Sequence, residues 1–239
     1  MITIIQPTYY LPETTVQMFP FLMEHVERCG RICYKSEDRI TEDSAERFVN
    51  GIRKSGHESV LEHALITAIV ICSRACSHQL VRHRIAAYSQ ESQRYCDYGK
   101  KDSLQVVCPP SIGLLPGDYQ GDYDRDRYEW ILWRDDSEHH PVEITCANEQ
   151  QVRWVMHIDS VYDEYMRELK EGIKPEDARY LLPNATKTEL AVTFNLRQWR
   201  HVFRERALNR HAQWEIRGIF SAILVDLKKR FPAIFCDLE

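Results

Sequence analysis

Apolar residues recur every three or four positions along several stretches of the chain, and this spacing predicts helices. The predicted helices cover Met18–Arg31, a segment that starts near Thr41 and stops at Gly56, Arg74–Val81, Glu149–Leu169, Pro175–Pro183, Asn195–Arg206 and Ala212–Arg230. Thr41 offers a hydroxyl that can cap a helix, and Gly56 is the residue type that most often ends one. Helices are therefore the main elements of the predicted fold.

Three shorter stretches carry a strand pattern. Polar and apolar residues alternate from Thr186 to Phe194, Ala64–Cys72 is rich in β-forming residues, and Gln105–Cys108 ends at a pair of prolines. Strands and helices do not alternate regularly along the chain, so the sequence predicts the α+β class. A length of 239 residues is enough for one large domain, and we expect a single domain over residues 1–239.

Residues 117–149 are aromatic and acidic and follow no helical period. The segment begins Gly117-Asp118-Tyr119-Gln120-Gly121-Asp122-Tyr123-Asp124. We expect it to be an acidic insertion or a surface loop, and the sequence does not separate these two interpretations.

The composition is that of a globular protein, with 44% hydrophobic and 28% charged residues. The net charge of −5 argues against a general nucleic-acid or membrane-surface binder, because such proteins carry an excess of Lys and Arg. No apolar run is long enough to cross a bilayer, and the first residues lack the features of a signal peptide, so we expect a cytoplasmic protein.

Eight cysteines in a chain of this kind are expected to be reduced thiols. Two pairs, Cys29/Cys33 and Cys72/Cys76, have the spacing C-x3-C, whereas zinc knuckles use tighter spacings. We therefore expect no metal site. The common nucleotide and zinc signatures, G-x-G-x-x-G, the Walker A motif and H-E-x-x-H, are also absent from the sequence.

The stretch Arg82–Tyr95 concentrates arginines, serines, tyrosines and amide side chains directly after an apolar run. Arg82, Arg84 and Arg94 repel one another unless a phosphate or carboxylate lies between them. A solvated basic loop is the alternative, but such loops favour lysine and this stretch has none. We therefore expect an anionic ligand here.

A second group of ionisable residues lies just upstream, in the connector Gly56–His63. His57, Glu58, Glu62 and His63 are crowded between a predicted helix and a predicted strand, where titratable groups often line a cleft. Either histidine alone could be structural. Their closeness in sequence to the arginine stretch favours one site that contains both groups.

Four ordered blocks of the chain resemble the flavin-dependent thymidylate synthases. The first blocks are Gly56-His57-Glu58 with Glu62-His63, and Arg82-His83-Arg84 followed after seven residues by Ser92 and then Arg94-Tyr95. The later blocks are Ala178-Arg179 with Leu182-Pro183, and Asn195-Leu196-Arg197 with Arg206 and His211–Arg217. They span most of residues 40–217 in the order of the family.

The resemblance implies a fold with a central, mostly antiparallel sheet flanked by helices, and a homotetramer with active sites at subunit interfaces. It implies non-covalent FAD and a reductive methylation of dUMP to dTMP. In that reaction 5,10-methylenetetrahydrofolate gives the one-carbon group, and FAD reduced by NADPH gives the hydride. No cysteine acts as the nucleophile.

The resemblance also implies individual roles. Substrate-binding residues would be Gln79, Gln90, Ser92, Arg94, Arg179 and Arg206. Cofactor-binding residues would be Glu62, Arg82, His83, Arg84, Ile85, Asn195, Arg197 and His201. Ser92, Arg206 and His57 would be catalytic: Ser92 below the uracil ring, Arg206 polarising its edge, and His57 against the flavin.

The chain departs from the family pattern at Ala87, at Gln90 and at His201, where relatives often carry Ser, Glu and Asn. Three other interpretations stay open. One is a flavoprotein that modifies another pyrimidine nucleotide, for example by hydroxymethylation. The others are a nucleic-acid-binding module, which fits poorly with the acidic net charge, and an inactive paralogue that binds no flavin.

Overall fold

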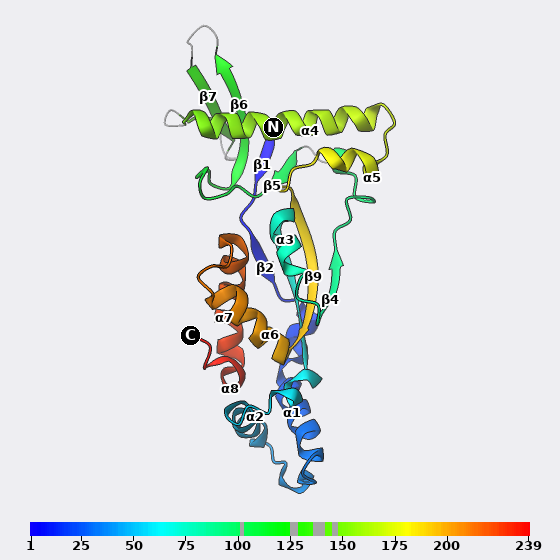
Figure 1. Ribbon diagram of the computed structural model, residues 1–239, viewed down its shortest axis with the longest axis vertical. Helices are drawn as coiled ribbons and strands as arrows, with labels where there is room; N and C mark the ends of the chain where they lie inside the picture. The colour runs from blue at the N-terminus through cyan, green and yellow to red at the C-terminus, as the bar shows by residue number, and fades with distance from the viewer. Residues whose placement is uncertain (101–102, 125–128, 136–141, 145–147) are drawn as a thin grey trace. The chain divides into compact units, whose positions relative to one another are not determined.

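The computed structural model describes residues 1–100, 103–124, 129–135, 142–144 and 148–239 (Figure 1). The chain divides into two compact units. The first comprises Met1–Pro7, Cys72–Ala75 and Gln90–Thr188, and the second comprises Thr8–Ile71, Cys76–Ser89 and Glu189–Glu239. Each unit is built from segments that lie far apart in the sequence.

Helices and strands are both well represented, and the predicted α+β class is confirmed. The helices are α1 (Glu13–Ile32), α2 (Ser44–Lys54), α3 (Arg74–Leu80), α4 (Glu149–Lys170), α5 (Pro175–Ala178), α6 (Leu196–Val202), α7 (Trp214–Arg230) and α8 (Pro232–Phe235). The strands are β1 (Ile2–Ile4), β2 (Thr8–Tyr10), β3 (Leu65–Ser73), β4 (Ala87–Gln90), β5 (Leu104–Val106), β6 (Gly117–Asp124), β7 (Glu129–Asp135), β8 (Val142–Glu143) and β9 (Lys187–Asn195). Short 3-10 helices are η1 (Glu37–Arg39), η2 (Glu58–His63), η3 (Tyr98–Lys100) and η4 (Arg179–Leu181), and η5 (Phe203–Leu208) is a π-helix.

The first unit contains a five-stranded sheet in the order β5-β1-β6-β7-β8. Strand β1 pairs in parallel with β5 and antiparallel with β6, and β6 pairs antiparallel with β7 over seven residue pairs. Helix α4 lies across β6 and β7, as Figure 1 shows. Its residues Val152, Val155 and Ile158 recur at helical spacing and are buried in the core of this unit.

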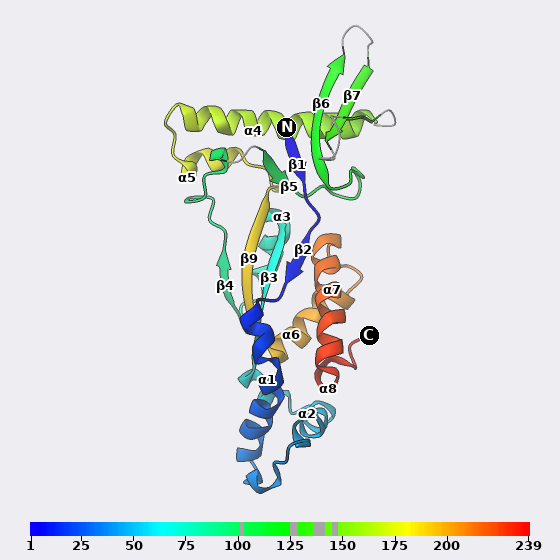
Figure 2. The ribbon, with the colours of Figure 1, turned by 180° about the vertical axis from the view of Figure 1, so that it is seen from behind.

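The second unit holds most of a four-stranded sheet in the order β2-β3-β9-β4. Side chains of β9 alternate between half-buried and fully buried, as expected for a strand with one covered face. Helices α6 and α7 contribute aromatic residues to the core, where Trp199, Phe203 and Phe220 pack together with ring centroids 5.3 to 6.4 Å apart. Helices α1 and α2 pack against each other in the same unit (Figure 2).

Most of the predicted helices are present, but their ends differ. Helix α1 begins at Glu13 rather than Met18 and contains Pro20. Helix α2 begins at Ser44, and the Ser44 hydroxyl accepts a hydrogen bond from the Thr41 amide, so Thr41 is not its N-cap. Gly56 follows α2 with φ +72°, which confirms it as the residue that ends this helix.

The segment 117–149 is not a loop throughout, because its described part forms β6, β7 and β8. Whether it is an insertion stays a prediction, as does the single domain over residues 1–239. Among the described residues, no helix combines the length and the apolar composition needed to span a membrane.

Candidate functional site

The residues predicted to bind ligands fall in both units. Gln90, Ser92, Arg94 and Arg179 belong to the first unit. His57, Glu62, Gln79, Arg82–Ile85, Asn195, Arg197, His201 and Arg206 belong to the second.

In the first unit, a turn after β4 presents Ser92 and Arg94. The amides of Tyr95 and Cys96 donate to the Ser92 carbonyl at 3.2 and 2.8 Å. The Arg94 amide donates to the Ser92 hydroxyl oxygen at 3.3 Å. The hydroxyl therefore accepts a bond from its own turn, and its proton can be donated to a ligand.

Arg94 and Arg179 meet at Glu176, a residue that the sequence did not single out. Arg94 Nε and Nη2 lie 3.1 and 3.0 Å from Glu176 Oε2, and Arg179 Nε donates to the Glu176 carbonyl at 3.0 Å. The ion-paired side chains are exposed, at 51% for Arg94 and 37% for Glu176. Both guanidinium groups therefore lie at one acidic residue, and a phosphate could replace its carboxylate at Arg94.

Gln90 and Glu91, which precede Ser92, bind different partners. Lys187 Nζ lies 3.0 Å from Glu91 Oε2, and both side chains are largely buried. The Gln90 amide donates to Thr188 Oγ1 at 3.1 Å. Burial, followed by the charge of Glu91 and a hydrogen bond with it, raises the pKa of Tyr98. The Glu91 carboxylate is therefore held by Lys187 within this buried group of side chains.

In the second unit, His83 is buried and holds Arg206. Arg206 Nε donates to His83 Nε2 at 2.9 Å. Burial, then the charges of Arg206 and His201, lower the His83 pKa to about 4. The imidazole is thus neutral at pH 7, and because Nε2 accepts, its proton lies on Nδ1.

Arg206 lies in the π-helix η5 rather than in a regular helix. The sequence predicted one helix over Asn195–Arg206, but α6 ends at Val202 and the wider turn follows. Single π-helical turns are rare and are frequently found at functional sites. The change of helix type therefore coincides with a residue predicted to be catalytic.

His83 is buried, whereas its neighbours in the sequence are exposed. Arg82 and Arg84 are exposed on either side of the buried imidazole, and Ile85 is 66% exposed. Gln79 is half-buried near the end of α3, and its carbonyl accepts a hydrogen bond from the Arg82 amide at 3.4 Å. Two arginines and an apolar side chain are thus presented to solvent by one short connector.

Five of the eight predicted cofactor residues line one cavity of about 340 Å³, here called the Glu62 pocket. It is lined by Glu62, Ile85, Asn195, Arg197, Gln198 and His201. Arg197 Nη1 lies 2.5 Å from Glu62 Oε1, and both side chains are about half exposed. The Asn195 side chain caps α6 by accepting from the Gln198 amide at 2.7 Å. Residues from η2, β9 and α6 therefore converge with Ile85 on one cavity, and their role in binding FAD stays a prediction.

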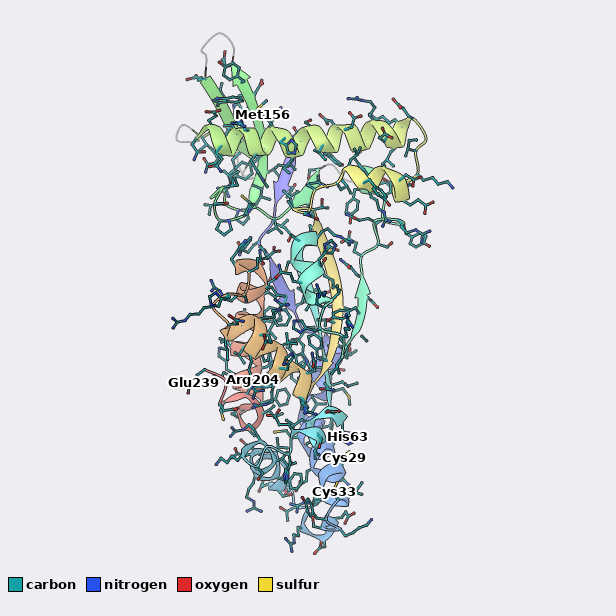
Figure 3. The ribbon with its side chains drawn as sticks, viewed as in Figure 1. Cys29, Cys33, His63, Met156, Arg204 and Glu239 are labelled. Carbon is teal, nitrogen blue, oxygen red and sulfur yellow. The ribbon has the colours of Figure 1, made fainter. Side chains whose placement is uncertain are left out.

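A second cavity of about 580 Å³, here called the His57 pocket, shares Arg197 with the first. It lies between the end of α1, one face of α2 and the connector 56–60. The crowded connector predicted a cleft at His57, but no sequence signal pointed to Cys33, Arg47 or Gly51, which also line the pocket. Cys33 is the C-cap residue of α1, and Figure 3 shows it beyond Cys29 at the end of that helix. No motif links these residues, because only the packing of α1 on α2 brings them together.

Residues 17–233 match the family model described as thymidylate synthase complementing protein (Thy1). A flavin-dependent thymidylate synthase from Pyrococcus furiosus is 37% identical over 203 residues, which cover 84% of this chain and 70% of that protein. Another, from Geobacter sulfurreducens, is 35% identical over 219 residues, 89% of this chain and 80% of that protein.

Among solved structures, the crystal structure of a UMP/dUMP methylase, PolB, from Streptomyces cacaoi bound with 5-Br dUMP is similar with a TM-score of 0.67. The similarity covers 98% of this chain and 95% of that one, at 23% sequence identity. At this identity the likeness concerns the fold, which agrees with the α+β architecture described above.

Proposed function

The chain belongs to the thymidylate synthase complementing protein (Thy1) family, and from this membership we propose that it is a flavin-dependent thymidylate synthase. It converts dUMP to dTMP by reductive methylation, with 5,10-methylenetetrahydrofolate as the one-carbon donor and NADPH as the reductant of FAD. The observation that carries the proposal is the convergence of five predicted flavin residues on the Glu62 pocket. The same family resemblance supports a cytoplasmic homotetramer with shared active sites.

The donor set of the second unit fits FAD. The Glu62 and His57 pockets both include Arg197, whose exposed ion pair with Glu62 can open to bind a phosphate. Arg82 and Arg84 are exposed and cationic, and Asn195 offers an amide suited to the edge of a heterocycle. When bound, FAD would supply the hydride that completes the methyl group.

The arginines of the first unit fit the 5′-phosphate of dUMP. Arg94 holds this phosphate in place of the Glu176 carboxylate, since a phosphate offers more acceptor oxygens and more charge, and Arg179, now bonded to the Glu176 carbonyl, turns its remaining guanidinium nitrogens to the same phosphate. Ser92 donates its hydroxyl proton to the nucleotide, with its oxygen fixed by the Arg94 amide. These contacts position the nucleotide, and the bonds that form and break are at the reactive carbon of its uracil ring.

Arg206 and His57 act on the reacting rings. The neutral His83 occupies Arg206 Nε, which leaves the two terminal nitrogens of the guanidinium to donate to a uracil oxygen and stabilise negative charge there. His57 forms part of the wall of its pocket and excludes water from the flavin side. No step uses a cysteine thiolate.

The first test is an absorption spectrum of the purified chain with added FAD, after unbound dye is removed. We expect a flavin spectrum that stays with the protein and shifts on addition of dUMP. Arg82→Ala and Arg84→Ala should lose FAD retention, and Arg94→Ala should lose dUMP affinity but keep FAD. Arg230→Ala is the matched control, because Arg230 forms an exposed ion pair with Asp226 on α7.

Turnover with labelled methylenetetrahydrofolate then identifies the product. Label in the methyl group of dTMP supports the proposal, whereas label in a hydroxymethyl group would indicate the related pyrimidine-modifying activity. A chain that stays colourless with FAD would contradict the proposal and favour a nucleic-acid-binding or inactive protein.

A further inference from the structure

Arg200 is a buried charge with no role in the ligand contacts above. It lies on α6 and is 1% exposed, next to the predicted flavin residue His201. Burying a guanidinium is costly unless hydrogen bonds and an opposite charge compensate for the lost water. The groups that compensate this buried charge are therefore fixed in position by Arg200.

All three guanidinium nitrogens of Arg200 have partners in the second unit. Nη1 and Nη2 donate to Asp237 Oδ1 and Oδ2 at 2.8 and 2.7 Å, a two-bond contact, and Nη1 also donates to the Ile234 carbonyl. Nε donates to Glu58 Oε1 at 2.9 Å. Arg200 therefore joins two carboxylates that lie far apart in the sequence.

Two further arginines stabilise this cluster. Arg53 Nη1 lies 3.3 Å from Asp237 Oδ1, and Arg204 Nη2, on the residue labelled in Figure 3, lies 3.7 Å from Glu58 Oε1. The Asp237 pKa is lowered to about 2, chiefly by the hydrogen bonds from Arg200. The carboxylate of Asp237 is therefore ionised throughout the pH range in which enzymes of this kind work.

Glu58 is the first residue of η2 and directly follows His57. His57 is the N-cap of η2, yet its side chain makes no capping hydrogen bond. Both residues line the His57 pocket. The other end of η2 is tied to α6 by the exposed pair Glu62–Arg197, so the Glu58–Arg200 contact, which is less exposed, is the firmer of the two.

We propose that Arg200 and Asp237 are positioning residues, which act through Glu58 to fix the start of η2 and so hold His57 at the wall of its pocket. The proposal rests on the proposed function, because the role of His57 belongs to it. The contacts of Arg200 with Asp237 and Glu58 are here called the clasp. Asp237 lies outside residues 17–233, which match the family model.

The test compares Asp237→Asn with the double variant Arg200→Met/Asp237→Leu in the full chain. Arg200 is buried and Asp237 is partly exposed. Replacing such a pair by apolar residues removes the uncompensated guanidinium that Asp237→Asn leaves, so the double variant should fold even if the single one does not. Asp226→Asn is the control, because it removes a carboxylate from the exposed Arg230–Asp226 pair of the same unit.

Two measurements are made on each protein. The first is the His57 imidazole signal in the NMR spectrum of the flavin-free chain, assigned by its loss in His57→Gln. The second is the single-turnover rate of FAD reduction by NADPH, together with the KM for dUMP. We expect a broadened or split His57 signal, and reduction slowed by about tenfold or more at a KM for dUMP changed by less than about twofold.

An unchanged His57 signal in the folded double variant would overturn the proposal, as would a reduction rate equal to that of the control. The two hypotheses fail differently. A wild-type chain that takes up no FAD contradicts the proposed function, and the NMR comparison still decides whether the clasp holds His57.

Discussion

At the scale of single residues, His83 shows how burial changes the chemistry of an exposed-looking motif. It stands between two arginines in the sequence, but its side chain is 9% exposed whereas both neighbours face solvent. Its lowered pKa keeps it neutral, so it accepts a hydrogen bond from Arg206 instead of repelling that arginine. His83 thus holds Arg206, the arginine predicted to be catalytic, in addition to its predicted contact with the flavin.

This arrangement predicts a pH dependence of stability. The His83 pKa is about 4 in the folded chain and 6.5 ordinarily, so the unfolded chain binds more protons between these values. The stabilising contribution is therefore complete above pH 6.5 and is lost as the pH falls toward 4. Lowering the pH from 7 to 4 should therefore reduce the free energy of unfolding of both proteins. We expect the reduction to be about 2 kcal/mol smaller for His83→Gln than for the wild type.

Denaturant unfolding at several pH values measures this difference. Glutamine keeps an acceptor for Arg206 but does not titrate in this range. His78→Gln, at an exposed position of α3, should retain the wild-type slope. Parallel curves for the wild type and His83→Gln would show that the buried imidazole does not titrate as expected.

Glu176 leads to the second prediction at this scale. Its carboxylate occupies Arg94, so a phosphate must displace it before binding. Because exposed ion pairs contribute at most about 1 kcal/mol, Glu176→Gln should tighten dUMP binding by about two- to fivefold. Deoxyuridine, which lacks the phosphate, should bind unchanged. Equal affinities of variant and wild type for dUMP would place the phosphate elsewhere, and Glu164→Gln, in the Glu164–Arg167 pair, is the control.

At the scale of elements, two helical glycines that line the His57 pocket predict opposite effects. A Cβ on Gly30 of α1 would lie 2.7 Å from ring atoms of Phe48, whereas a Cβ on Gly51 of α2 would meet nothing within 4 Å. Gly30→Ala should therefore lower the free energy of unfolding by about 1–3 kcal/mol. Gly51→Ala should raise it by about 0.5–1 kcal/mol, since alanine favours the helix.

Gly51 also tests whether the His57 pocket receives part of the flavin. Gly51→Leu fills open space rather than displacing a neighbour, so it should fold normally and yet weaken FAD binding. Fluorescence titration of FAD against both Gly51 variants measures the effect. An unchanged FAD affinity in Gly51→Leu would confine the flavin to the Glu62 pocket.

Periodicity predicted the long helices, because their burial follows the helical repeat: α4 buries Val152, Val155 and Ile158. Strands β6 and β7 were missed because their side chains are mixed in polarity, and pairing with β1 rather than an apolar pattern fixes β6 in the sheet. The change from α6 to the π-helix η5 could not be predicted, because Trp199, Val202 and Phe203 form one continuous buried apolar stripe across it.

The candidate site was predictable where motifs are local. The Glu62 pocket is lined by residues from three sequence blocks that resemble the family. These residues could be selected from the order of the blocks alone. Glu176 and Asp237 were missed, because each acts through an arginine that is distant in sequence. Such partners depend on packing rather than on spacing.

At the scale of the whole molecule, the overall charge is negative although the predicted ligand sites contain arginines. The net charge is −5, yet arginines lie at the places proposed to bind phosphates. A dinucleotide or nucleotide bound there would meet local arginines, whereas a long polyanion would be repelled by the acidic remainder of the surface. This distribution supports small phosphorylated ligands over nucleic acid.

The eight cysteines provide a final prediction about the entire chain. The seven in the described residues form no disulfide, and Cys72 and Cys76 are fully buried. Burial raises the pKa of the Cys108 thiol, which is the opposite of what a nucleophile requires. We expect each of eight single Cys→Ala variants, including Cys146 outside the described residues, to form dTMP within about threefold of the wild-type rate.

Cys33→Ala is the most demanding member of the series, because Cys33 lines the His57 pocket and a loss of FAD there could resemble a loss of chemistry. Flavin content is therefore measured for each variant before its rate. Intact mass spectrometry of acid-quenched reactions should show only the unmodified chain, since no cysteine bonds to the uracil ring. A variant that binds FAD but forms no dTMP, combined with a nucleotide-sized mass increase in the wild type, would identify a cysteine nucleophile and contradict the proposed mechanism.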